Sequence, residues 1–114
     1  MTHQDTIRDY FRCYKDRDRS RLVEILTEDL VHSGPFGRYE NRDKMLDEIW
    51  PHVGPIWAVD VEVFGDGPGY MVRYRHEGAS AGRLSEYMRF DGDRIAEIEV
   101  YHGAGAIPGL PGAA

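Results

Sequence analysis

The stretch Leu84–His102, LSEYMRFDGDRIAEIEVYH, predicts two strands that alternate apolar and polar residues around a turn at Asp91-Gly92. Side chains in a strand point alternately to its two faces, so one face of the first strand carries Leu84, Glu86, Met88 and Phe90. An ionised carboxylate among apolar neighbours is costly, so an acid there more cheaply stays protonated and donates a hydrogen bond to an anion. Glu86 is therefore the first candidate functional residue.

Length and composition limit the classes of protein to which this sequence can belong. A chain of 114 residues fits one domain, which we place at residues 1–103, followed by a flexible, Gly- and Pro-rich tail at 104–114. The 14 Lys and Arg residues are outnumbered by 20 Asp and Glu residues and are spread along the chain, so nucleic-acid binding is not expected. The single cysteine and the lack of an apolar leader or membrane-spanning run predict a soluble, cytoplasmic protein.

Apolar residues at helical spacing predict two helices near the start of the chain. The first covers about residues 4–15, where Ile7, Tyr10, Phe11 and Tyr14 form one stripe. The charged link KDRDRSR, residues 15–21, is expected to be a solvated turn, and its Asp18 or Ser20 can cap the second helix. The apolar face of that helix would carry Leu22, Ile25, Leu26 and Leu30.

A third helix is predicted after a turn that Gly34, Pro35 and Gly37 force, with residues 30–33 extended before it. Asn41 is its expected N-cap, and Pro51 ends it. Its buried face would carry Met45, Leu46, Ile49 and Trp50.

From Val59 onward the period of the apolar residues changes from about 3.6 to about 2, which predicts antiparallel strands. The inward-facing sets are Val59, Val61 and Val63, then Tyr70, Val72, Tyr74 and His76, and finally Ala96, Ile98, Val100 and His102. Helices followed by a strand meander predict an α+β fold, with three N-terminal helices packed on one face of a curved, mainly antiparallel sheet.

This order of elements, with DGDRIAEIEVYH as the last strand, resembles the nuclear transport factor 2-like superfamily and, within it, the ketosteroid isomerase and SnoaL-like polyketide cyclase branch. The resemblance covers about residues 4–103 and is strongest around Glu86–Tyr101 and in the Thr27-Glu28-Asp29 turn. It implies a cone-shaped, cystatin-like fold with a pocket at its open end, and a homodimer.

The resemblance also implies roles for particular residues. Glu86 falls where the isomerases keep an acid before a Met-Arg-Phe-Asp run, and Tyr10 falls on their oxyanion-binding tyrosine, with Tyr14 one turn further on. Gly34 stands where those enzymes have the aspartate that acts as general base. A steroid isomerase mechanism therefore lacks its base in this chain.

His32 is the candidate replacement base, because it lies two residues before Gly34 on the same side of an extended segment and an imidazole has an ordinary pKa of about 6.5. The residues expected to line a common pocket are Tyr10, Tyr14, His32, Trp50, Trp57, Tyr74, His76, Glu86, Met88 and His102.

Simpler interpretations stand beside these. Glu86 can belong to a structural ion pair, His32 can lie at the surface, and the tyrosines and tryptophans can be plain core. The five histidines show no metal-binding spacing, and the Gly-rich segments show no nucleotide-binding motif, so neither a metal nor a cofactor is expected.

The sequence thus predicts a protein that binds an apolar, oxygenated small molecule, such as a polyketide-like or steroid-like ring compound. If it is an enzyme, the expected chemistry is cofactor-free isomerisation, cyclisation, dehydration or epoxide opening, with His32 removing a proton while Tyr10 and protonated Glu86 donate to the enolate. The alternatives are a member that only binds a ligand or protein partner, and a dimerisation domain that uses the polar outer face of the sheet.

Overall fold

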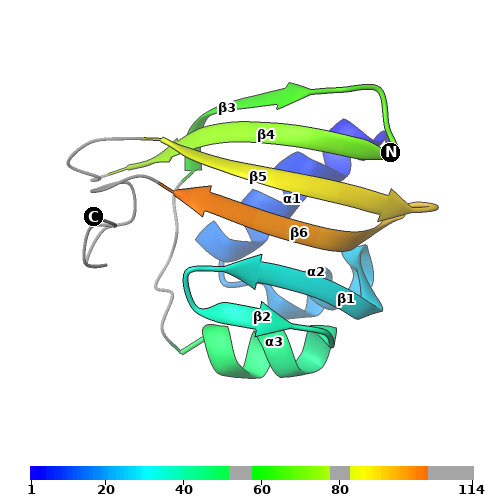
Figure 1. The fold of residues 1–114 in the computed structure, drawn as a ribbon, viewed down its shortest axis with the longest axis vertical. Helices are drawn as coiled ribbons and strands as arrows, with labels where there is room; N and C mark the ends of the chain where they lie inside the picture. The colour runs from blue at the N-terminus through cyan, green and yellow to red at the C-terminus, as the bar shows by residue number, and fades with distance from the viewer. Residues whose placement is uncertain (52–57, 78–82, 103–114) are drawn as a thin grey trace.

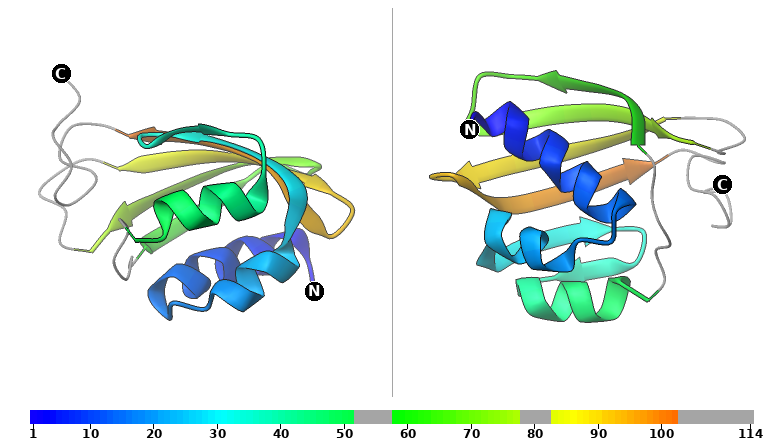
Figure 2. Two further views of the ribbon diagram at one scale, coloured as in Figure 1. Left: turned by 90° about the horizontal axis from the view of Figure 1, so that it is seen from below. Right: turned by 180° about the vertical axis from the view of Figure 1, so that it is seen from behind.

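The computed structural model describes residues 1–51, 58–77 and 83–102. Within these ranges, helices lie on one face of a curved, six-stranded sheet (Figure 1), as the left view of Figure 2 shows most clearly. The elements are α1 His3–Lys15, α2 Arg19–Ile25, β1 Leu26–Gly34, β2 Gly37–Tyr39, α3 Arg42–Ile49, β3 Ala58–Phe64, β4 Gly69–His76, β5 Leu84–Asp91 and β6 Arg94–His102. The predicted α+β architecture is confirmed.

The helices begin where the sequence places side-chain caps. At the start of α1 the Thr2 hydroxyl accepts the Asp5 N–H at 3.0 Å, and the Asp5 carboxylate accepts the Thr2 N–H at 3.0 Å. The caps of α2 and α3 are Asp18 and Asn41, whose side chains accept the N–H groups of Arg21 and Lys44. The buried stripe of α1 is the predicted one, Ile7, Tyr10, Phe11 and Tyr14.

The strand order in the sheet is β2-β1-β6-β5-β4-β3. Strand β1 runs parallel to β6, and the other neighbours are antiparallel, so the sheet is mixed but mainly antiparallel. Glu86 of β5 lies opposite Val72 on β4 and Val100 on β6. This register places the acid within the sheet, away from either edge.

Strand β5 has the predicted alternation, whereas in β6 a register shift leaves both Ile95 and Ala96 buried. Residues Leu84, Glu86, Met88 and Phe90 are buried, while the residues between them are partly exposed. Gly92 in the turn has a φ of 62°, a left-handed conformation that glycine adopts without steric cost. The side of β5 that faces the helices is thus apolar except at Glu86.

The prediction for the second helix was wrong beyond Ile25. Leu26 has extended dihedral angles and begins β1, in which Leu26, Leu30 and His32 are buried on one face. A spacing of four residues suits both a helical stripe and one face of a strand, so the apolar pattern did not separate the two. The expected Thr27-Glu28-Asp29 turn is part of β1, where its register against β6 shifts.

The turn expected near Gly34 joins β1 to a short strand, β2, that the sequence did not predict. Gly34 pairs with Gly37 across this turn, and His32 pairs with Tyr39. Strand β2 has only three residues, too few for an alternation to be recognised. Trp57 and the predicted tail at 104–114 lie outside the described residues, and the domain limit at residue 103 stays a prediction.

Candidate functional site

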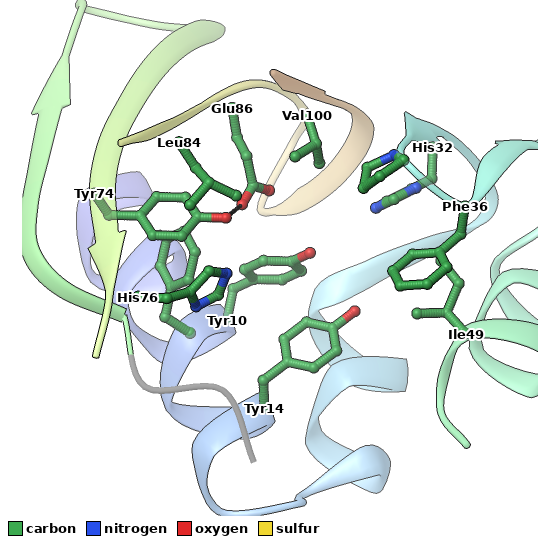
Figure 3. Close-up of a pocket in the computed structure, with 12 residues that line it drawn as sticks. Tyr10, Tyr14, His32, Phe36, Ile49, Tyr74, His76, Leu84, Glu86 and Val100 are labelled. Atoms are coloured by element: carbon green, nitrogen blue, oxygen red, sulfur yellow. Dashed lines mark hydrogen bonds between the residues drawn. The ribbon is translucent and has the colours of Figure 1, made fainter. Parts of the chain in front are cut away.

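A cavity lies between the helices and the concave face of the sheet (Figure 3). Its volume is about 80 Å³, and pockets for drug-sized ligands usually measure about 300–1,000 Å³. It therefore fits a compound of one ring or one end of a larger compound. The lining residues are Tyr10, Phe11, Tyr14, His32, Pro35, Phe36, Ile49, Tyr74, His76, Leu84, Glu86 and Val100.

Glu86 is the most unusual member of this lining, because it is only 3% exposed. The Tyr74 hydroxyl donates a short hydrogen bond to Glu86 Oε2, whereas Glu86 Oε1 has no hydrogen-bond partner among the described residues. Burial raises the pKa of Glu86 to about 7, and the hydrogen bond from Tyr74 lowers it in part. Near neutral pH this side chain can therefore be a hydrogen-bond donor, which an ordinary glutamate cannot be.

Two further hydroxyls, those of Tyr10 and Tyr14, reach the cavity from α1, one helical turn apart. Figure 3 shows both pointing toward the space that Glu86 also faces. Burial raises the pKa of Tyr10 well above its usual value and raises that of Tyr14 to about 12. Both hydroxyls consequently keep their protons at physiological pH, and a hydrogen bond between them further raises the pKa of Tyr10 and lowers that of Tyr14.

His32 comes from β1, on the side of the cavity away from Tyr74 and His76 (Figure 3). It is 6% exposed, so the alternative of a surface histidine is wrong. Its Nδ1 has no hydrogen-bond partner among the described residues, and burial lowers its pKa to about 4. The imidazole is thus neutral at pH values where an exposed histidine would begin to charge.

Glu86 and His32 have the reverse of the ordinary order of basicity. A free imidazole binds a proton more tightly than a free carboxylate, but here the pKa of Glu86 is about 7 and that of His32 is about 4. Between these values the cavity holds a protonated acid and an unprotonated base. His76, also buried, has a pKa lowered by burial, and its ring lies edge-on to Tyr74 with centroids 5.5 Å apart.

The structure brings six of the ten predicted pocket residues together, namely Tyr10, Tyr14, His32, Tyr74, His76 and Glu86. Trp50, Met88 and His102 are not among the lining residues that the structure describes. Met88 is fully buried in the core, and Trp50 packs against it partly buried. Their predicted contact with a ligand remains a prediction, as does that of Trp57.

Sequence reasoning missed the apolar half of the lining: Phe11, Pro35, Phe36, Ile49, Leu84 and Val100. Two of these could have been predicted from the strand alternation, because Leu84 lies on the same strand face as Glu86 and Val100 on the same strand face as His102. Phe36 had none, since it lies in the β1–β2 turn and is 38% exposed. The acid and the hydroxyls therefore lie against an apolar wall.

An ion pair does not account for the burial of Glu86, since its described contacts are the Tyr74 hydrogen bond on one oxygen and none on the other. Within the described ranges no three His, Cys, Asp or Glu side chains cluster in a way that could hold a metal ion. None of the described helices is both long and apolar enough to cross a membrane.

A curved sheet that covers three helices and encloses a cavity between the layers defines the nuclear transport factor 2-like class of folds. The sequence matches the SnoaL-like domain over residues 7–98, and the chain belongs to this family. No curated protein matches the sequence closely enough to count as a relative.

Solved structures agree on the fold. A nuclear transport factor 2-like protein of unknown function from Cytophaga hutchinsonii has a TM-score of 0.76 and 16% identity, over 90% of each chain. A candidate polyketide cyclase from Sinorhizobium meliloti has a TM-score of 0.74 and 20% identity, over 89% of this chain and 100% of that one. A cystatin-like protein from Xanthomonas campestris has a TM-score of 0.73 and 14% identity, over 90% and 91%. At such identities the likeness establishes the fold alone.

Proposed function

We propose that the cavity binds the oxygenated end of a neutral, largely apolar compound and transfers a proton at the carbon next to its carbonyl group. The observation that carries this proposal is the buried Glu86 carboxyl group, with one oxygen held by Tyr74 and the other without a partner at the cavity. A buried polar atom without a partner costs free energy, and a ligand oxygen that accepts its proton would remove that cost.

The charge of the lining supports a neutral ligand. All 14 Lys and Arg residues lie in the described ranges, and none of them lines the cavity. An anionic ligand would be desolvated there without a cationic partner and would meet a carboxyl group that is itself negative above pH 7. We therefore expect ketones, aldehydes or phenols to bind, and carboxylates and phosphate esters to be rejected.

The proposed reaction uses the pair of groups with reversed basicity. Neutral His32 takes a proton from the carbon next to the carbonyl, and the oxygen of the resulting enolate accepts hydrogen bonds from Tyr10 and protonated Glu86. The imidazolium then returns the proton to a different carbon, which completes an isomerisation. The same groups suit aldol-type cyclisation, dehydration or epoxide opening, in which an oxygen also gains negative charge.

Three structural neighbours named as candidate polyketide cyclases, from Sinorhizobium meliloti, Pseudomonas putida and Xanthomonas campestris, favour a carbonyl-rich ring compound within this class. The cavity volume of about 80 Å³ favours a ligand whose reacting end is no larger than one ring.

A second candidate function is ligand binding without catalysis. It is favoured by the low pKa of His32, about 4, because such an imidazole is a weak base. It is also favoured by Gly34, since this position contributes no carboxylate. In this case the acid and the tyrosines would hold a ligand oxygen but no proton would leave carbon.

Binding of β-naphthol, a planar phenol that resembles an enolate, tests the proposal. Quenching of tryptophan fluorescence should show saturable binding at pH 6, weakened about 10-fold or more in Glu86→Gln and unchanged in Glu62→Gln, a surface control on the outer face of the sheet. Binding that is absent, or that is equal in Glu86→Gln, would overturn the proposal. Turnover of small enones at pH 6, lost in His32→Phe, would then separate catalysis from binding alone.

The proposal also includes a cytoplasmic homodimer that forms through the outer face of the sheet. Phe64, Met71 and Tyr101 are 50%, 41% and 51% exposed on this face, and a second copy of the chain would bury their apolar surface. The ion pairs Arg73–Glu62 and Arg89–Glu97 join neighbouring strands of the sheet. Sedimentation of the purified protein as a monomer at micromolar concentration would contradict this part.

A further inference from the structure

Arg17 occupies a backbone position that favours glycine. Helix α1 ends in a Schellman motif, in which the Arg17 N–H donates to the Tyr14 carbonyl at 3.3 Å and the Asp18 N–H donates to the Cys13 carbonyl at 2.8 Å. Arg17 has a φ of 56°, the left-handed conformation in which a side chain is disfavoured. A non-glycine residue in a left-handed conformation costs free energy, so its presence indicates that its side chain makes a useful contact elsewhere.

The Arg17 side chain reaches the end of α3. Its guanidinium carbon lies 3.9 Å from the centroid of the Trp50 ring, and its Nη2 donates to the Trp50 carbonyl at 3.2 Å. One side chain thus holds both the ring and the backbone of Trp50, with a cation at the carboxyl end of the helix. The expectation that residues 15–21 form a solvated turn was therefore wrong at Arg17, and also at Lys15, which ends α1, and at residues 19–21, which begin α2.

Trp50 in turn contacts the wall of the cavity. Its ring centroid lies 5.9 Å from that of Tyr14, with the planes tilted by 39°. Tyr14 lines the cavity, and the nearby charge of Arg17 lowers its pKa, against the larger rise that burial causes. The structure therefore contains a continuous series of contacts from Arg17 through Trp50 to a cavity hydroxyl.

We propose that Arg17 is a positioning residue, which fixes Trp50 against Tyr14 and so directs the Tyr14 hydroxyl toward a ligand in the cavity. This inference rests on the proposed function, because it assigns Tyr14 as a donor to the ligand oxygen. Arg17 itself does not line the cavity, so its effect on a ligand passes through the two aromatic rings.

Replacement by glycine separates positioning from stability. In Arg17→Gly the relief of the left-handed conformation offsets the lost stacking, so we expect a melting temperature within roughly 4 °C of the parent. The dissociation constant of β-naphthol should nevertheless rise about 5-fold to 10-fold. The matched control is Asp60→Gly, since Asp60 also has a left-handed φ, 55°, but makes an exposed ion pair with Arg75. Its β-naphthol affinity should not change.

A double-mutant cycle with Trp50→Ala shows whether Arg17 acts through that ring. If it does, Arg17→Gly should have no further effect on affinity once Trp50 is removed. Arg17→Lys, which keeps the charge but not the planar stacking, should recover only part of the affinity. Equal effects of Arg17→Gly with and without Trp50, or an unchanged affinity in Arg17→Gly, would overturn the inference.

A ligand-free measurement keeps this result distinct from a failure of the proposed function. In a Trp57→Phe background, fluorescence reports on Trp50, and Arg17→Gly should increase its quenching by acrylamide. If β-naphthol does not bind the parent protein, the proposed function fails, and the acrylamide result alone decides whether Arg17 fixes Trp50. Quenching that Arg17→Gly leaves unchanged would refute that role.

Discussion

Replacing Glu86 by Gln should change the stability of the protein in a pH-dependent way. The folded protein binds the Glu86 proton more tightly than the unfolded chain, because burial moves the pKa from 4.5 to about 7. As the pH rises from about 4.5 to about 7, the unfolded chain releases this proton first, so the free energy of unfolding falls. Above pH 7 both states are ionised and the loss is complete.

The size of this effect follows from the shift. Each pKa unit corresponds to about 1.4 kcal/mol, so Glu86 should lower the free energy of unfolding by about 3 kcal/mol between pH 4.5 and pH 8. Glutamine has nearly the same shape and does not titrate. Glu86→Gln should therefore gain about 3 kcal/mol relative to the parent protein over that range, whatever its stability at pH 4.5.

Urea denaturation at several pH values, monitored by circular dichroism, measures this difference directly. The titrations of His32 and His76 occur in both proteins and cancel in the comparison. Tyr74→Phe is an informative second variant, because the Tyr74 hydrogen bond lowers the pKa of Glu86 and its loss should steepen the pH dependence. A parent-minus-variant difference that is equal at pH 5 and pH 8 would refute the reasoning.

Three other predictions concern the base and the position beside it. The parent protein should lose stability as the pH falls from 6.5 to 4, because the pKa of His32 is about 4 in the folded state and the unfolded chain therefore binds the proton first. His32→Gln should not show this loss. The difference in the free energy of unfolding should reach about 3 kcal/mol in urea denaturation. If a substrate is found, kcat/KM should be highest between about pH 4 and pH 7, where His32 is unprotonated and Glu86 is protonated. A kcat/KM that instead rises through pH 7 would assign the role of base to the Glu86 carboxylate. In Gly34→Asp the new Cβ would lie 3.5 Å from His32 Cε1 and 3.3 Å from Val100 Cβ, so the added carboxylate should raise the pKa of His32. Proton NMR of the imidazole measures this pKa, and an unchanged pKa would contradict the prediction.

The fold was largely predictable because its strongest signals are local. The alternation in β5 and β6, the Asp91-Gly92 turn and the stripe of α1 each depend on neighbouring residues only. Strand β1 was partly misassigned because its pairing with β6 is parallel and distant in sequence, so no local pattern reports it. The three-residue β2 pairs with β1 across the turn between Gly34 and Gly37 and is too short to give an alternating pattern.

The sequence predicted the polar half of the cavity lining, but neither its apolar half nor the pKa values of Glu86 and His32. An acid on the apolar face of β5 drew attention to Glu86, but its hydrogen bond with Tyr74 depends on how two strands meet. The sequence suggested a His32 pKa of about 6.5, and packing from several elements lowers it to about 4. Arg17 gave no signal at all, because its partner Trp50 lies on another helix and its left-handed backbone is not visible in the residue type.

The most direct test of the account is a carbon NMR titration of the Glu86 side-chain carboxyl group, assigned by its absence in Glu86→Gln. We predict a midpoint near pH 7 in the free protein, moving higher in Tyr74→Phe and when β-naphthol is bound. A midpoint close to the ordinary value of 4.5 would mean that the carboxyl group is ionised and solvated at neutral pH, and would contradict its role as a hydrogen-bond donor to a ligand.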